Sequence, residues 1–124
     1  MTETSKDRYD VWVRDYVKAW ESNDPSDIGA LFSADARYFT EPYEAPKLGR
    51  DAIVRDWIDR KDAPGDWTFE YDMLVSTQTV GILRGTTRYG TSGKTYENLW
   101  EIYLTPDGTA REFVEWWMLV PKTD

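Results

Sequence analysis

The fold is decided by residues 67–120, which read WTFEYDMLVSTQTVGILRGTTRYGTSGKTYENLWEIYLTPDGTAREFVEWWMLV. β-Branched and aromatic residues dominate this stretch, and it divides into four strand-like runs: Trp67 to Val75, Val80 to Tyr89, Lys94 to Leu104 and Ala110 to Val120. Short turns separate the runs. Because connections this short join neighbouring strands that run in opposite directions, the sequence predicts an antiparallel four-strand meander.

The segment before the meander is helical in pattern. One apolar stripe recurs at three- and four-residue spacing and predicts a first helix with Thr4 as its N-cap; it consists of Tyr9, Trp12, Val13, Tyr16, Val17 and Trp20. Asp24-Pro25 is typical of a helix start and predicts a short second helix running through Ile28, Leu31 and Phe32.

A short strand at 36–39, a proline-kinked loop at 41–46 and a third helix at 50–60 complete the expected order. Helices that precede a meander indicate an α+β fold. We expect one domain over residues 1–124, with three helices in its N-terminal half and a curved, cone-shaped antiparallel sheet.

Composition and charge exclude several classes of function. The net charge of −8 argues against binding to nucleic acid or to an anionic membrane. The chain contains no Cys and no His, so thiolate nucleophiles, His-based triads and the usual zinc sites are excluded, and we expect neither a metal nor an organic cofactor. Residues 1–4 are polar, no apolar stretch resembles a signal peptide or a membrane span, and a cytoplasmic location is expected.

Several short motifs, in their order and spacing, resemble the nuclear transport factor 2-like superfamily. The motifs are YVKAW at 16–20, the stretch 24–35 with Leu31-Phe32, EPY at 41–43, LGRDAI at 48–53 and Asp107-Gly108 before the last strand. The resemblance is greatest to the polyketide-cyclase-like (SnoaL-like) and ketosteroid-isomerase-like branches. It implies a cone-shaped fold that serves isomerases, dehydratases, cyclases, epoxide hydrolases and plain binding domains.

The isomerase pattern also implies roles for individual residues. Tyr16 matches a tyrosine that donates a hydrogen bond to the developing oxyanion, and Glu41, before Pro42, is the nearest match to the catalytic base. Trp100 falls where that pattern has a second, acidic oxyanion donor, and its indole N–H is a neutral donor instead. Mechanisms of the superfamily that depend on histidine are unavailable to this chain.

Period-two alternation, matched to the family, predicts which strand residues face the inside of the cone. On the last strand these are Arg111, Phe113, Glu115 and Trp117; on the two strands before it they are Tyr96, Asn98, Trp100 and Ile102, and Leu83, Gly85, Thr87 and Tyr89, with Gly85 leaving room. We expect a ligand to touch Trp100, Asn98, Phe113, Trp117, Tyr89 and, from the third helix, Trp57.

Glu115 is the most informative of these residues. A carboxyl group between aromatic side chains should have a raised pKa, as a general acid or base requires. The alternative is a structural ion pair between Glu115 and an inward arginine, for which the candidates are Arg84, Arg88 and Arg111. A register slip of one residue would turn Glu115 outward.

The outer face of the predicted sheet carries Leu99, Tyr103, Trp116 and Met118, interrupted by glutamates. An exposed apolar patch of this kind favours an interface, and we expect a symmetric homodimer through it. Three functions remain open from the sequence: a cofactor-independent acid/base enzyme acting on an apolar cyclic molecule, a non-catalytic pocket for a hydrophobic ligand, and a structural dimer whose cone is filled by its own aromatic side chains.

Overall fold

A computed structural model describes residues 5–121, so the expected N-cap Thr4 lies outside the described part. The elements are α1 (Ser5–Ser22), α2 (Pro25–Gly29), β1 (Phe32–Phe39), β2 (Lys47–Leu48), α3 (Arg50–Asp59), β3 (Trp67–Ser76), β4 (Gly81–Tyr89), β5 (Thr95–Leu104) and β6 (Ala110–Leu119). None of the helices in this range is long and apolar enough to cross a membrane.

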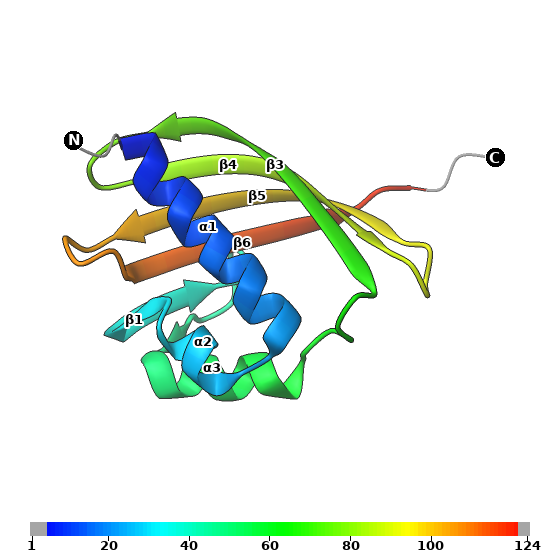
Figure 1. Ribbon diagram of the computed structural model, residues 1–124, viewed down its shortest axis with the longest axis horizontal. Coiled ribbons are helices and arrows are strands. Elements are labelled where there is room, and N and C mark those ends of the chain that lie inside the picture. Colours follow the sequence, from blue (N-terminus) through cyan, green and yellow to red (C-terminus); the bar gives the residue numbers. More distant parts are fainter. Residues whose placement is uncertain (1–4, 122–124) are drawn as a thin grey trace.

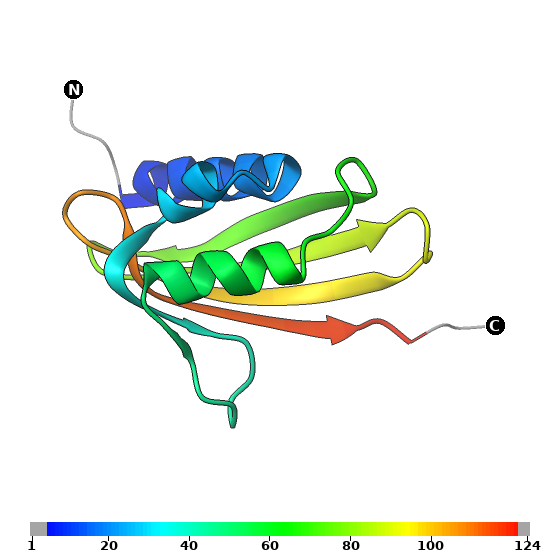
Figure 2. The same ribbon diagram turned by 90° about the horizontal axis from the view of Figure 1, so that it is seen from below.

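The strands form one six-stranded sheet in the order β2-β1-β6-β5-β4-β3. Strands β3 to β6 pair antiparallel with their neighbours in sequence, which confirms the predicted meander. β1 joins β6 in parallel, with Tyr38 opposite Phe113, and β2 pairs with the outer edge of β1. The sheet curves, and the helices cover one side of it (Figures 1 and 2).

α1 lies across the concave side of the sheet and buries the predicted apolar stripe. Tyr9, Trp12, Val13 and Tyr16 are buried, and the Trp12 indole N–H donates to the Leu31 carbonyl oxygen at 3.0 Å. The Trp12 ring lies 5.0 Å from the ring of Phe113 on β6, so helix and sheet share one aromatic core.

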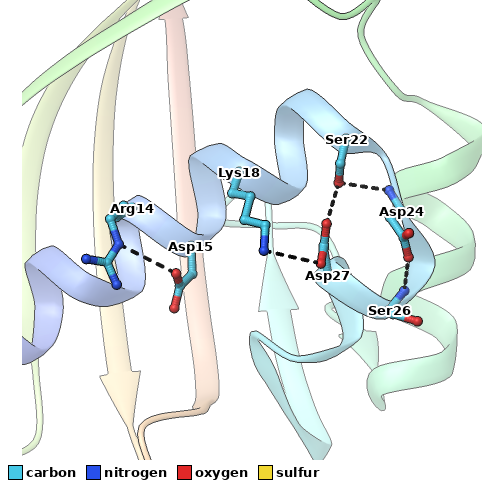
Figure 3. A network of polar contacts seen from close by, with 7 residues as sticks. All are labelled: Arg14, Asp15, Lys18, Ser22, Asp24, Ser26 and Asp27. Carbon is cyan, nitrogen blue, oxygen red and sulfur yellow. Dashed lines mark hydrogen bonds and ion pairs between the residues drawn. The ribbon is translucent and has the colours of Figure 1, made fainter.

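The turn from α1 into α2 is held by short polar side chains (Figure 3). Asp24 is the N-cap of α2 and its carboxylate accepts from the Ser26 backbone N–H at 2.7 Å, while Ser22 donates to Asp27 at 2.7 Å. The prediction that this helix runs through Phe32 was wrong. Phe32 already pairs with Ala110, because a buried edge position next to β6 satisfies its backbone better than another helical turn.

Two details of the sheet correct the predicted faces. Arg111 is the extra residue of a β-bulge, since Glu112 pairs with Tyr103 and Ala110 with Leu104, and its guanidinium lies 5.3 Å from the Tyr103 ring on the convex side. It therefore does not face inward. The space beside Gly85 is occupied by Phe69, whose ring would lie 2.6 Å from a Cβ at that position.

Candidate functional site

A pocket of about 450 Å³ opens between the concave side of the sheet and the helices α1 and α3. Its volume is in the range of sites that bind small organic molecules. Eight aromatic side chains form much of its wall: Tyr16, Trp20, Tyr38, Trp57, Tyr89, Tyr96, Trp100 and Trp117. The structural-dimer hypothesis requires a cone filled by the chain's own aromatic side chains. The pocket shows that the cone is not filled.

Glu115 lies in this pocket and is held by two tyrosines from different elements. The hydroxyl groups of Tyr16 on α1 and Tyr38 on β1 both donate to Glu115 Oε2, each at 2.6 Å. Tyr38 reaches it because the parallel β1–β6 pairing puts Tyr38 opposite Phe113, on the same face as Glu115. Three segments far apart in sequence thus converge on one carboxyl oxygen.

The electrostatics of this cluster are set by burial. Burial raises the pKa of the Glu115 carboxyl, while the hydrogen bonds from Tyr16 and Tyr38 lower it and so limit the rise. The pKa values of the two tyrosines lie well above the usual value, first because of burial and then because of the Glu115 charge. The two tyrosines therefore stay protonated and neutral as hydrogen-bond donors. Glu115 is the member of the cluster that changes between carboxylate and carboxylic acid.

The second oxygen of Glu115 is available to a ligand. Oε1 has no hydrogen-bond partner within residues 5–121, nor is it among the polar atoms sealed from solvent, so it is accessible from the pocket that Glu115 lines. A carboxylate that is anchored through one oxygen and free at the other is suited to accept a proton from a bound molecule.

Asn98 supplies a neutral donor on the same wall. Its carbonyl Oδ1 accepts from the Thr87 hydroxyl at 2.8 Å, which turns the Nδ2 amide group toward the remaining space. The side chain is 6% exposed and lines the pocket, and Nδ2 has no partner in the described part of the chain. Asn98 pairs with Trp117 and therefore lies diagonally next to Glu115, within reach of one small ligand.

A second acid, Asp62, lines the same pocket and was missed by the sequence analysis. Its Oδ2 accepts from the Trp20 indole N–H and from the Tyr89 hydroxyl, both at 2.9 Å. Its backbone carbonyl oxygen accepts from Asn23 at 3.1 Å. The residue lies in a polar loop after α3, where no periodicity or motif points to it; the only signal is a carboxylate next to the turn Ala63-Pro64-Gly65.

The charge of Asp62 acts on the carboxyl group of Glu115. The Asp62 charge adds to the rise of the Glu115 pKa, and burial together with the Asp62 hydrogen bond raises the pKa of the Tyr89 hydroxyl. In residues 5–121 no three acidic side chains converge as a metal-binding group would. The two acids are thus arranged as separate anchored carboxylates.

The predicted ligand-binding residues fall into two groups. Trp57, Tyr89, Asn98, Trp100 and Trp117 all line the pocket, and Trp117 is 41% exposed at its opening. Phe113 does not line it: this ring is fully buried behind Tyr16 and Trp100, at centroid distances of 5.5 and 5.2 Å, and supports the wall from behind.

The geometry does not support two of the roles that the motif match assigned, those of Glu41 as a base and of Trp100 as a donor, whereas Trp100 does line the pocket as the strand alternation predicted. Glu41 is exposed in the turn after β1 and does not line the pocket, because the proline-kinked loop turns away from the sheet there. Trp100 lines the wall and stacks on Phe69 at 4.9 Å, but its indole nitrogen is buried and without a partner. The neutral donor presented to the pocket is therefore Asn98 and not Trp100.

None of the three candidate arginines forms the structural ion pair with Glu115 that the sequence left open as an alternative. Arg88 pairs with Glu70 at 2.6 Å on the outer face, Arg84 is exposed, and Arg111 stacks on Tyr103. None of the ion pairs in the described part of the chain includes Glu115. Among residues 5–121, the hydrogen-bond partners of the carboxyl group are the two tyrosine hydroxyls, and Glu115 lines the pocket.

Comparisons with solved structures give the same architecture. The chain is similar to an NTF-2 like protein of unknown function from Burkholderia xenovorans LB400 (TM-score 0.76, 11% identity, covering 98% of this chain and 91% of the other). It is also similar to a ketosteroid isomerase-like protein from Erwinia carotovora atroseptica SCRI1043 (TM-score 0.63, 14% identity, coverage 90% and 94%).

A third similar structure is that of SalBIII, described as an epoxide hydrolase/cyclase-like enzyme in pyran ring formation in the polyether salinomycin (TM-score 0.68, 15% identity, coverage 91% and 92%). Identities this low establish a shared fold only. No curated protein matched the chain. The family model of the SnoaL-like domain matches residues 13–118, which include α2, α3, the strands β1 to β5, all but the last residue of β6 and the C-terminal half of α1. The chain therefore belongs to the SnoaL-like domain family of the nuclear transport factor 2-like superfamily.

Proposed function

We propose that this chain is a cofactor-independent acid/base enzyme that acts on an apolar, cyclic, oxygenated small molecule. The observation that carries the proposal is the anchored Glu115 carboxyl, with Oε2 held by Tyr16 and Tyr38 and Oε1 open to an aromatic pocket. A partly buried carboxyl group without a charged partner costs stability. A cost of this kind is typical of functional sites, which favours a functional role for Glu115 over a structural one.

The chemistry follows from the donors and acceptors on the wall. Glu115 Oε1 would take a proton from the substrate, and the Asn98 amide would donate to the oxygen on which negative charge develops. Tyr16 and Tyr38 hold the carboxylate in place and stabilise its charge before the transfer. Isomerisation, dehydration, cyclisation and epoxide opening all use such a step, in line with the descriptions of the ketosteroid isomerase-like and epoxide hydrolase/cyclase-like neighbours.

A screen of cyclic ketones, lactones and epoxides tests the proposal. We expect turnover of at least one class, with Glu115→Gln lowering kcat by roughly a hundredfold or more, since general acid/base catalysis is worth about that much. Glu112→Gln, on the convex face of the same strand, is the matched control and should retain activity. Ligands that raise the melting temperature without any turnover would support the alternative, a non-catalytic binding domain, instead.

We also propose that two copies of the chain pair through the convex face of the sheet. Support comes from Leu99 and Trp116, which are paired across β5 and β6, from Tyr103, and from Met118, which is 54% exposed. Charges of both signs lie on the same face, since Arg84 is paired with Leu99 and Glu97 with Met118, so two copies can complement each other. Sedimentation equilibrium should give twice 14.5 kDa, and Met118→Lys should give the monomer; a wild-type mass of one chain would refute the pairing.

A further inference from the structure

The pocket carries an unusual charge distribution for so acidic a protein. The net charge of the chain is −8, yet four cationic side chains line this one pocket: Lys47, Arg60, Lys61 and Lys94. The acids Asp62 and Glu115 are anchored on its wall by neutral donors, as described above. These four cations lie close together in a protein whose overall charge is negative, so they would attract an anionic group of a bound ligand.

Two of the four cations share one acidic partner. Asp56 on α3 lies 3.2 Å from Arg60 Nε and 4.0 Å from Lys47 Nζ, so one carboxylate serves both. Lys61 and Lys94 have no ion-pair partner within residues 5–121, and both are exposed at the pocket's opening. The two pocket cations without an ion-pair partner in this range are therefore Lys61 and Lys94, while Asp56 offsets one of the two charges of Arg60 and Lys47.

The segments that carry these two lysines are fastened to each other. Lys61 follows α3, and Lys94 precedes β5; Figure 1 shows both segments at the same end of the molecule. Asp66 links them: its carboxylate accepts from the Thr91 N–H at 2.8 Å and the Thr91 hydroxyl at 2.6 Å, and its carbonyl oxygen accepts from the Gly90 N–H at 2.7 Å. The two backbone segments that carry the lysines are thus held together at Asp66.

We propose that the ligand of this pocket is an amphiphilic carboxylate, with its anionic group between Lys61 and Lys94 and its apolar ring system among the tryptophans. The inference rests on the proposed function only for the identity of the pocket. An anionic group placed next to Glu115 instead would meet like-charge repulsion, which favours the orientation with the anion at the two lysines. The ring carbon or oxygen that reacts is then the part of the molecule farthest from the carboxylate, next to Glu115.

Binding of a matched probe pair tests this assignment without any turnover. 2-Naphthoate and 2-naphthamide have the same ring system and differ in charge, and their dissociation constants can be measured by calorimetry. We expect 2-naphthoate to bind at least fivefold more tightly at low salt, with the preference shrinking at 0.5 M NaCl, because exposed charge pairs are worth up to about a factor of five each and are screened.

Variants locate the effect. Lys61→Met with Lys94→Met should weaken 2-naphthoate binding by roughly three- to twentyfold and leave 2-naphthamide binding unchanged. Lys18→Met, on the outer side of α1, removes one positive charge away from the pocket and should affect neither probe. Equal affinity for the two probes, failure of 2-naphthoate to bind, or an unchanged preference in the double variant would overturn the proposal.

The outcome is separable from the acid/base function. If the protein prefers 2-naphthoate through the two lysines but turns over no substrate, the proposed ligand class is supported and the proposed enzymatic activity is refuted. Turnover of neutral substrates that is insensitive to the two lysines does the reverse.

Discussion

The hydroxyl group of Tyr16 lies 2.6 Å from Glu115 Oε2 although the two residues are 99 positions apart, one on the first helix and one on the last strand. The bond crosses the interior of the fold and ends at the pocket wall. Tyr38 donates to the same oxygen from β1, so the position of the Glu115 carboxyl depends on helix docking and on sheet pairing at once. Several consequences of this arrangement can be measured.

Replacing Glu115 by Gln should leave stability unchanged or increased at neutral pH. The amide oxygen of Gln can still accept from both tyrosines, and the cost of a partly buried charge disappears. Because burial raises the folded-state pKa of Glu115, its stabilising contribution is complete below the unfolded pKa and is lost as pH rises through the folded pKa. The advantage of Gln over Glu should therefore grow from pH 4 to pH 8 in urea denaturation.

A loss of about 3 kcal/mol or more in this variant would identify Glu115 as one partner of a structural charge pair. The control is Glu112→Gln on the convex side of β6, where only the exposed pair with Arg37 is lost. That change should cost less than about 1 kcal/mol at every pH.

Removing either tyrosine hydroxyl should raise the pKa of Glu115 further. Tyr16→Phe and Tyr38→Phe each delete one hydrogen bond to the ionised carboxylate, a bond of the kind worth about 1.5–3 kcal/mol, or roughly one to two pKa units. The carboxyl ¹³C shift of Glu115 followed against pH gives the value. Tyr71→Phe removes one hydrogen bond to Asp10, outside the pocket, and should leave the pKa of Glu115 unchanged; an equal shift in that variant would contradict the assignment.

Asp62→Ala should destabilise the pocket wall. The change leaves the Trp20 indole and the Tyr89 hydroxyl without their shared acceptor, and an unsatisfied partly buried donor costs about 1–3 kcal/mol. Chemical denaturation measures the loss, and Trp20 emission reports the altered surroundings. Asp59→Ala, an exposed acid three residues earlier, should change stability by less than about 0.5 kcal/mol; similar losses in both variants would refute the anchoring role.

Gly85→Ala should be costly even though it adds a single methyl group. The new Cβ would lie 2.6 Å from the Phe69 ring and 3.0 Å from the Glu70 carbonyl oxygen. Phe69 stacks on Trp100, so its displacement would reach the pocket wall, and overpacking of this kind costs about 1–3 kcal/mol. Thermal unfolding checks the stability. Full recovery in Gly85→Ala with Phe69→Leu would confirm that the clash is with this ring, and no recovery would place it elsewhere.

The sequence predicted the elements whose signals are local. The apolar stripe of α1 and the four runs of the meander match the structure to within one or two residues, because each is set by periodicity and by turns within its own stretch. The alternation that places Glu115 and Trp117 on one face also held, since Trp100 pairs with Glu115 and Asn98 with Trp117. Pattern fails where one residue breaks the period, as Arg111 does in the bulge.

The rest of the site depends on contacts between distant segments. Tyr38 reaches Glu115 only through the parallel pairing of β1 with β6, for which strand patterns in the sequence contain no register. Asp62 acquires its position from Trp20 and Tyr89, whose side chains come from a helix and a strand on either side of it. Glu41 was selected by its place before a proline, which fixes the backbone of the loop but not the direction in which the loop leaves the sheet.

The link that Asp66 makes between the α3–β3 segment and the β4–β5 turn has a kinetic consequence. Segments joined by three hydrogen bonds cannot swing apart as a lid does, so a ligand passes through an opening of constant size. Observed association rates should then rise linearly with ligand concentration in stopped-flow traces, in a single phase, without the plateau that a slow opening step imposes. Thr91→Val, which deletes the hydroxyl bond, is the variant in which such a plateau would first emerge.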